Sequence, residues 1–377
     1  MKKKKLLFLI ESFIVGGAEK VLIDLVNNLS AEEYDITVCS VFKHSVYKEY
    51  DNAFDKPFKP HIKYRYLINN NIQGIYVLFN YLIIRIPNFL FKLLVGNNYN
   101  IVIAFYEGLP TFWIAQAKLY SCKKIAWLHT LTELSQKGKS KEELEKQKKY
   151  YSKYDQIIAV SKRVANSFTK LFPQLEQSIK VIYNPINITN IQEKAIYPIQ
   201  LEKKNFPTFV CVGRITEVKG YDRWLRVLLR LKNKGYKFQS WIIGGGDREI
   251  YEQFVIENQL TDYVVFLGHQ DNPYPYIAKA DWVVCPSLLE GLGNIVLEGI
   301  ALNKAIIVTD GVGAKEFLEN NQSGIICKNN EEDIEKVIEN IIHNDSLKGY
   351  YELCIKKQSK DFTISSIIKH IEELFNA

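Results

Sequence analysis

Short hydrophobic runs alternate with amphipathic helical patterns along almost the whole chain. The first run, residues 6–10, leads through a glycine loop into a segment with helical periodicity. The apolar residues of that segment share one helix face: Val21, Leu22, Leu25, Val26 and Leu29. Further runs predict strands at 36–42, 101–105, 124–129, 156–161 and 179–185. Uninterrupted apolar runs between helices are typical of parallel strands that helices cover on both faces.

The pattern breaks at Asn184-Pro185 and restarts after a polar segment, 187–205, which is predicted to be a linker. The second series of strands is predicted at 209–213, 240–244, 264–268, 281–287, 305–310 and 324–328. The predicted fold class is therefore α/β, with two doubly wound Rossmann-like domains, 1–186 and 206–355, facing across a cleft. Residues 356–377 are expected to form a C-terminal helix that packs back on the first domain.

Two segments imitate membrane sequences. The basic N-terminus has an apolar run of only residues 6–10 before Glu11 interrupts it, which is too short for a secretory core, so a cytoplasmic protein is expected. Residues 75–95 are long enough to span a bilayer, but Arg85 and Pro87 interrupt them. Two interpretations stay open for this segment: a buried helical pair, or an amphipathic element on the inner face of a membrane.

Composition narrows the possible partners. A length of 377 residues favours two domains. The net charge of +7 suits anionic head groups or phosphorylated ligands and is too small to indicate nucleic acid. The six cysteines are scattered without a C-x-x-C pair, which favours reduced thiols and no structural metal site. The strongly charged segment 137–153 is expected to be a solvated helix or a mobile loop.

The stretch "VGRITEVKGYDRWL" carries the first candidate site. Gly213 ends a strand, Arg214 and Lys219 follow in one loop, and a helix begins near Tyr221. Two cations beside a helix N-terminus form an anion site, and a bidentate arginine with a point-charge lysine suits a diphosphate. The alternative is a surface loop with ordinary charges.

Two glycine-rich loops also follow predicted strands. Gly16 and Gly17 would let a ligand approach the main chain at the start of a helix, although a plain tight turn explains the pair equally well. Gly244 opens the loop "GGGDRE", in which Glu249 replaces the last glycine of a G-x-G-x-x-G motif. That replacement argues against a dinucleotide-dependent dehydrogenase.

The stretch "EGLGNIVLE" places Glu290 and Glu298 eight positions apart. One interpretation is a turn residue and a solvated helix residue. In the other, Glu298 accepts hydrogen bonds from a ribose diol, Glu290 reaches a sugar hydroxyl, and Gly291 and Gly293 leave loop amides open to oxygens of the ligand. This arrangement suits a nucleotide sugar better than a glycosidase, whose two carboxylates straddle one bond.

In combination, "VGR…VKG", E-x7-E at 290–298 and "GGAE" near the start resemble the retaining nucleotide-sugar glycosyltransferases of family 4, which have the two-domain GT-B fold. The resemblance covers nearly the whole chain in the expected order. It implies a donor site made of Gly213, Arg214, Lys219, Gly244, Gly291, Leu292, Gly293, Asn294 and Glu298. Within it, Arg214 and Lys219 would bind the diphosphate and Glu298 the ribose. Glu290 would touch the transferred sugar.

The resemblance extends to the first domain. His129 matches a histidine that the family places near the donor sugar, although a lone histidine at a strand end is as often structural. Gly16 and Gly17 would line the acceptor side. The segments 160–168 and 182–186 stand where members carry similar sequences, whereas Asn294 stands where many relatives have an apolar residue.

The expected mechanism uses no metal and no cofactor, because the sequence contains no D-x-D motif. Arg214, Lys219 and helix dipoles would stabilise the charge on the leaving diphosphate, and His129 would complete the catalytic set. By the resemblance, the acceptor hydroxyl attacks on the face from which the nucleotide leaves, and a phosphate oxygen takes its proton. Glu290 would orient the sugar without acting as a nucleophile.

The predicted function is transfer of a sugar from a nucleotide sugar to a lipid-linked or saccharide acceptor, in surface polysaccharide or glycolipid synthesis. The resemblance favours uridine as the base. Two alternatives stay open: an epimerase or hydrolase of the same fold, and a non-catalytic subunit that binds nucleotide sugars.

Overall fold

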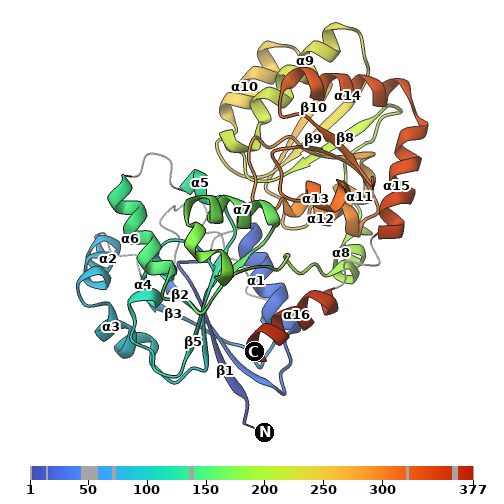
Figure 1. Cartoon of the computed structure of the whole chain (residues 1–377). Coiled ribbons are helices and arrows are strands. Elements are labelled where there is room, and N and C mark those ends of the chain that lie inside the picture. Colours follow the sequence, from blue (N-terminus) through green and yellow to red (C-terminus); the bar gives the residue numbers. More distant parts are fainter. Residues whose placement is uncertain are drawn as a thin grey trace. The chain divides into compact units, whose positions relative to one another are not determined.

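The computed structural model describes residues 2–13, 16–43, 58–69, 74–135, 140–319, 322–358 and 364–376. The chain forms two compact units, shown in Figure 1. Unit 1 comprises Met1–Pro185 together with Ser365–Ala377, and unit 2 comprises Ile186–Ile364.

Unit 1 is built on a seven-stranded parallel sheet in the order β3-β2-β1-β4-β5-β6-β7. Its elements are β1 (Lys4–Ile10), α1 (Gly17–Asn28), β2 (Tyr34–Phe42), β3 (Lys63–Ile68), α2 (Ile75–Arg85), α3 (Pro87–Leu90), the π-helix η2 (Phe91–Val95), β4 (Ile101–Ala104), α4 (Leu109–Gln116), β5 (Lys123–Leu128), α5 (Thr132–Ser135), α6 (Lys141–Tyr151), β6 (Gln156–Ala159), α7 (Lys162–Leu171), the 3-10 helix η3 (Pro173–Ser178), β7 (Ile179–Val181) and α16 (Ile364–Asn376).

Unit 2 is built on a six-stranded parallel sheet in the order β10-β9-β8-β11-β12-β13. Its elements are α8 (Ile188–Ala195), β8 (Thr208–Val212), the 3-10 helix η4 (Glu217–Lys219), α9 (Tyr221–Asn233), β9 (Gln239–Ile243), α10 (Glu249–Glu257), β10 (Val264–Gly268), α11 (Tyr274–Lys279), β11 (Trp282–Cys285), α12 (Asn294–Ala301), β12 (Ala305–Thr309), α13 (Lys315–Glu319), β13 (Ile325–Cys327), α14 (Glu331–His343) and α15 (Ser346–Gln358).

Both sheets have the doubly wound strand order, which confirms the predicted fold class. In each sheet the order reverses once, between β1 and β4 in unit 1 and between β8 and β11 in unit 2. Ligands of such sheets bind beyond the carboxyl ends of the strands at this switch point, because the loops on either side of it diverge. The loops after β1, β4, β8 and β11 are therefore where each unit is expected to carry its site.

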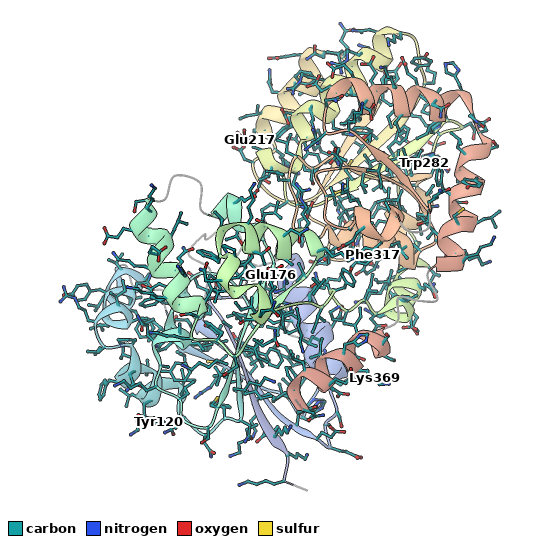
Figure 2. The ribbon with its side chains drawn as sticks, viewed as in Figure 1. Tyr120, Glu176, Glu217, Trp282, Phe317 and Lys369 are labelled. Atoms are coloured by element: carbon teal, nitrogen blue, oxygen red, sulfur yellow. The ribbon has the colours of Figure 1, made fainter. Side chains whose placement is uncertain are left out.

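The hydrophobic runs form strands, and their side chains are buried because helices cover both faces of the sheet. Leu6, Leu7, Phe8 and Leu9 of β1 are all fully buried, and Trp282 of β11 lies in the interior of unit 2 (Figure 2). The exception is β3, which the sequence pattern did not reveal. It is the edge strand of its sheet and its residues are only half-buried or exposed, so it lacks a continuous apolar run.

The C-terminal helix α16 belongs to unit 1, beside α1 (Figure 1). Phe375 makes edge-to-face contacts with Phe8 and Tyr34. The ammonium groups of Lys4 and Lys123 donate hydrogen bonds to the carbonyls of Phe375 (3.1 Å) and Leu374 (2.8 Å). Cations are favourable at a helix C-terminus, so these contacts hold the C-terminal end of α16 against the sheet of unit 1.

The segment predicted to be a linker, 187–205, is partly folded. It contains α8, which begins at an Asn187 cap and belongs to unit 2. The Gln192 side chain donates a hydrogen bond to the carbonyl of Ala301 at 2.9 Å, and Ile191 is buried. The composition of this segment is polar because only one face of the short helix is buried, so the helix left no apolar pattern in the sequence.

Residues 75–95 form a bent helical pair, α2 followed by α3 and η2, with an angle of 111° between the two parts. Phe79, Ile83 and Phe91 are buried, so one face of the pair packs on unit 1. The other face exposes large apolar side chains: Val77, Leu78, Tyr81, Ile84, Ile86, Phe89 and Leu93. We call these seven residues the apolar surface. The segment is therefore a helical pair with one buried and one exposed apolar face.

Within the described residues, no single helix is both long enough and apolar enough to cross a membrane, and only this bent pair passes when its two parts are taken together. The charged segment 137–153 contains helix α6, which begins with a reciprocal Ser140–Glu143 capping box. Residues 136–139 lie outside the described residues.

Candidate functional site

In unit 2 the loops after β8 and β9 stay paired beyond the ends of their strands. Gly213 donates its N–H to the carbonyl of Ile243 (2.9 Å), and Ile215 donates to Gly245 (2.8 Å). A Cβ on Gly244 would lie 1.9 Å from the Gly213 carbonyl oxygen, so only glycine fits there. This pairing fixes the main chain on either side of Arg214 at the carboxyl edge of the sheet.

The loops after β8 and β11, which flank the switch point, are tied together by hydrogen bonds. Leu288 donates its N–H to the carbonyl of Val218 at 2.8 Å. The buried Arg223 guanidinium donates to the carbonyl of Pro286. Helix α9 begins directly after Lys219 and Gly220, as predicted, and Glu217 marks this loop in Figure 2.

These ties bring Lys219 and Glu290 into contact. The Lys219 ammonium lies 2.5 Å from the Glu290 carboxylate, and the two side chains are only 25% and 16% exposed. The same carboxylate accepts a hydrogen bond from the Ser287 hydroxyl at 2.8 Å. Sequence reasoning missed Ser287, although it stands only three residues before Glu290.

The environment keeps both partners charged. Burial alone would raise the pKa of Glu290, but the Lys219 ammonium and the Ser287 hydroxyl reverse the shift, so that this pKa lies below its usual value. Burial alone would lower the pKa of Lys219, but Glu290 holds it above its usual value. The guanidinium of Arg214 is close enough to act in the opposite direction on Lys219. Two cations and one carboxylate therefore share the switch point of unit 2.

The loop that carries Glu290 is held on its far side by the loop after β12. Glu290 donates its N–H to Gly311 (3.1 Å) and accepts from Gly313 (3.1 Å), while Leu292 accepts from Ala314 (2.6 Å). Leu292 as a whole is buried, so it supports the loop from below.

Helix α12 starts at Asn294, after Gly293 in a left-handed conformation (φ 93°), and places Glu298 in its second turn. Glu298 is only 8% exposed, which contradicts the interpretation of this residue as a solvated helix position. Gly291 in the preceding loop and Asn294 at the helix start are both half-buried. All the predicted donor residues thus lie in loops at the carboxyl edge of the unit 2 sheet or in the helices that follow them.

His129 lies in unit 1, directly after β5. Its ring stacks on Tyr106 (5.7 Å between centroids) and contacts Phe105 (4.8 Å). Burial lowers the pKa of His129 to about 3, and a hydrogen bond with the main chain of Phe105 only partly opposes the shift. The imidazole is therefore neutral at physiological pH. Gly16 and Gly17 cap and begin α1 after β1, half-buried and exposed respectively.

The pKa of His129 predicts a pH effect on stability. The unfolded chain takes up a proton on this residue below about pH 6.5, whereas the folded chain does not until about pH 3. The unfolded state binds more protons in this window, so the free energy of unfolding falls as pH falls, by about 1.4 kcal/mol between pH 7.5 and 5.5 for this residue. His129→Asn, which keeps a donor for Phe105, should lose less stability over the same range in urea titrations.

NMR of the ring protons provides the direct check. Of the six histidines, the His129 signal should stay at its neutral position from pH 8 to 5. A midpoint near 6.5 for His129, or an equal loss of stability in His129→Asn, would contradict the prediction.

Two family models match consecutive parts of the chain. The model described as Glycosyltransferase Family 4 matches residues 15–190, and the model described as Glycosyl transferases group 1 matches residues 192–360. Together they cover nearly all of both units.

Several similar proteins are named as glycosyltransferases. The chain is 28% identical over 215 residues to a Campylobacter jejuni N-acetylgalactosamine-N,N'-diacetylbacillosaminyl-diphospho-undecaprenol 4-alpha-N-acetylgalactosaminyltransferase, covering 56% of this chain and 57% of that protein. It is 27% identical over 144 residues to the lipopolysaccharide core biosynthesis glycosyltransferase LpsE of Rhizobium meliloti, covering 38% of this chain and 41% of that protein. The matched segments thus span about half the length of these relatives.

Solved structures share the fold. The Anabaena protein HepE, in complex with UDP and glucose, superposes with a TM-score of 0.79 at 20% identity, covering 99% of this chain and 100% of that one. A sucrose-phosphate synthase from Thermosynechococcus elongatus gives a TM-score of 0.77 at 16% identity, covering 99% and 98%. Both matches confirm the predicted GT-B fold.

Proposed function

Since this chain belongs to the glycosyltransferases of family 4 and group 1, we propose that it transfers a sugar from a nucleotide sugar to an acceptor hydroxyl, with retention of the anomeric configuration. The observation that carries the proposal is the Lys219–Glu290 pair at the switch point of unit 2, with Arg214 acting on the same lysine. A largely buried carboxylate beside two cations fits a ligand that carries both hydroxyl groups and a diphosphate.

The roles follow from the chemistry of each group. A lysine ammonium has three N–H donors, so Lys219 would keep Glu290 and bind a diphosphate oxygen at once. Arg214 would bind the diphosphate bidentately, and together the two cations would stabilise the charge that develops on the leaving group. Glu290, fixed by Ser287, would accept a hydroxyl of the transferred sugar. Glu298 would bind the ribose.

The reaction itself needs no nucleophile from the chain. The acceptor hydroxyl would attack the anomeric carbon on the face from which the diphosphate leaves, and a phosphate oxygen would take its proton. His129, neutral and held by aromatic rings, would contact the sugar as a hydrogen-bonding group and not as a cation. We propose that the reaction is independent of metal, since Lys219 and Arg214 would already supply two cations to the diphosphate.

The donor and acceptor classes are proposed from the relatives. Structures of HepE contain UDP and UDP-glucose, which supports a uridine nucleotide as the donor here. The name of the Campylobacter relative describes a diphospho-undecaprenol-linked saccharide, which supports a lipid-linked acceptor. The names of LpsE and of the capsular polysaccharide enzyme CapM of Staphylococcus aureus support a place in surface polysaccharide synthesis.

Slow hydrolysis of nucleotide sugars in the absence of acceptor tests the proposal. The purified chain would be incubated with UDP-glucose, UDP-galactose and their N-acetyl derivatives, and the free sugar followed by NMR. We expect release of a sugar that has, before mutarotation, the anomeric configuration of the donor. Release of the opposite anomer would refute retention, interconversion of the nucleotide sugars would support an epimerase, and binding without turnover even with lipid-linked acceptors would support a non-catalytic subunit.

We also propose that unit 1 binds a membrane through the apolar surface. No aspartate or glutamate occurs between Asp55 and Glu107, whereas Arg85 and Lys92 lie within the helical pair. The Arg85 guanidinium packs over the Tyr81 ring at 5.1 Å. The Asn88 side chain binds the main chain of Lys118, which brings the 86% exposed Tyr120 to the same edge of unit 1 (Figure 2). Apolar and aromatic side chains mixed with cations are typical of helices that lie on anionic lipid.

Charged substitutions in the apolar surface should abolish this binding. Ile84 and Leu93 are 63% and 65% exposed, and burying each in lipid is worth about 1.5–3 kcal/mol. In the double variant Ile84→Glu, Leu93→Glu we expect binding to vesicles of phosphatidylglycerol and phosphatidylcholine to fall at least tenfold in co-sedimentation.

The matched control lies in unit 2. Ile250 and Ile256, on α10, are 70% and 60% exposed, and their replacement by Glu should leave vesicle binding unchanged. Equal losses in both double variants would show that the apolar surface has no special role, and undiminished binding in the first variant would refute the proposal.

A further inference from the structure

The switch point of unit 1 carries its own set of polar side chains. Glu11 directly follows β1, Glu107 follows β4, and His129 follows β5, which are three adjacent strands of the sheet. A Cβ on Gly108 would lie 3.8 Å from the Glu11 carboxylate, so the loops after β1 and β4 meet there. Only His129 carried a signal in the sequence.

The two carboxylate oxygens of Glu107 differ in their hydrogen bonding. Oε1 accepts hydrogen bonds from the N–H groups of His129 and Thr130, both at 2.8 Å, and from the Thr130 hydroxyl at 3.0 Å. Oε2 is buried and has no hydrogen-bond partner among the described residues. The side chain is therefore held rigidly, with one acceptor unsatisfied.

His129 presents a second unsatisfied acceptor. Its Nε2 is buried and also lacks a partner in the part of the chain that the structure describes. Because the ring is neutral and its other nitrogen bonds the main chain of Phe105, the proton is assigned to Nδ1 and Nε2 carries a lone pair. Tyr106 and Phe105 hold the ring in place.

Burial raises the pKa of Glu107 in spite of the hydrogen bonds from Thr130 and His129, because no described donor stabilises the charge at Oε2. Buried oxygen and nitrogen atoms without a hydrogen-bond partner are unfavourable unless a ligand or water supplies one. Glu11 adds a second carboxylate nearby, one oxygen of which accepts a hydrogen bond from the Tyr76 hydroxyl at 2.9 Å. Hydroxyl groups would supply the hydrogen bonds that these atoms lack. A saccharide ring supplies such donors, whereas a phosphate or a carboxylate would add further acceptors.

We infer that Glu107 is a saccharide-binding residue, whose Oε2 accepts a sugar hydroxyl beside the one accepted by His129 Nε2. The inference rests on the proposed function and extends it to a residue outside the family motifs quoted above. Glu107 has a second role as a positioning residue, because its Oε1 fixes the main chain that carries His129.

Glu107→Gln separates the two roles. The amide oxygen keeps the two main-chain hydrogen bonds of Oε1, while an NH₂ donor replaces the unsatisfied Oε2 acceptor. Thr130→Val is the matched control, because it removes one hydrogen bond to Oε1 and leaves Oε2 unchanged. If Glu107 were only structural, the two variants would behave alike.

The measurement is a dissociation constant from ligand-observed NMR titration, in two arms. One arm uses UDP and the four UDP-sugars named above, and the other uses the methyl glycosides of the same four sugars. In Glu107→Gln we expect the dissociation constant of at least one sugar ligand to rise at least tenfold, and that of UDP to change least. In Thr130→Val we expect all dissociation constants to stay within twofold of the wild-type values. If only the UDP-sugars bind more weakly to Glu107→Gln, the saccharide at Glu107 belongs to the nucleotide sugar; if the methyl glycosides do so, it carries no nucleotide.

Equal affinities of Glu107→Gln and the wild-type chain for every sugar would overturn the inference, as would an equal loss in Thr130→Val. So would a wild-type chain that binds no sugar in either arm. Failure to bind UDP alone would count against the proposed function and not against Glu107, since the methyl glycosides test Glu107 without a nucleotide.

Discussion

Replacing Lys219 with Met is expected to destabilise unit 2 by about 3 kcal/mol and to lower turnover by about 10²–10³-fold. The substitution leaves the Glu290 carboxylate, only 16% exposed, without its cation. Removing one partner of a largely buried ion pair costs more than the pair contributes, because the remaining charge is desolvated and uncompensated. Thermal unfolding should shift down by about 10 °C for a unit of this size, and sugar release should fall in the hydrolysis assay.

A double-mutant cycle with Glu290→Gln isolates the electrostatic part. The double variant Lys219→Met, Glu290→Gln has no buried charge at this position and should be more stable than Lys219→Met alone, by about 1–3 kcal/mol. Turnover should stay low in all three variants, because each lacks a group that we propose to contact the substrate. A Lys219→Met chain as stable as the wild type would show that water, and not Lys219, compensates the carboxylate.

Replacing Gly244 with Ala is expected to cost about 3 kcal/mol or more. Its φ of 158° is strained for other residues, and a Cβ would lie 1.9 Å from the Gly213 carbonyl oxygen. The loops after β8 and β9 would have to separate, which moves Arg214 away from the switch point. Both the thermal midpoint and the affinity for UDP should therefore fall.

Gly245 provides the control in the same loop. Among the described residues a Cβ there would meet His269 alone, at 3.8 Å, and no unusual φ is required. Gly245→Ala should unfold within about 2 °C of the wild-type chain. Similar midpoints for the two variants would mean that the paired loops tolerate a shift, and would contradict the tight geometry described for Gly244.

The sequence predicted most of the fold because buried parallel strands leave an unambiguous signal. Each strand except β3 coincides with an apolar run, and β3 lacks one because it lies at a partly exposed edge. Helix α8 was hidden in a polar stretch because just one of its residues, Ile191, is buried. The periodicity of apolar residues in a sequence indicates buried faces, so helices and strands that bury few side chains leave no such pattern.

The candidate site could be predicted where several motifs occur together, and not where a single residue carries a proposed role. Arg214, Lys219 and Glu290 were identified from their loops, but their sequence separation gave no indication that Lys219 and Glu290 form an ion pair. Glu107 carried no signal, because one glutamate shortly after a strand is common. Its importance is visible only from the three donors on one oxygen and the absence of any described donor on the other.

The C-terminal helix has a consequence for how the protein is made. Helix α16 covers Phe8 and Tyr34, yet it is synthesised after all of unit 2. Unit 1 is thus begun before unit 2 and completed after it, and its apolar sheet face stays partly uncovered until residues 365–377 have been synthesised. A fragment that ends at Pro185 would keep every strand of its sheet and still lack part of its own interior.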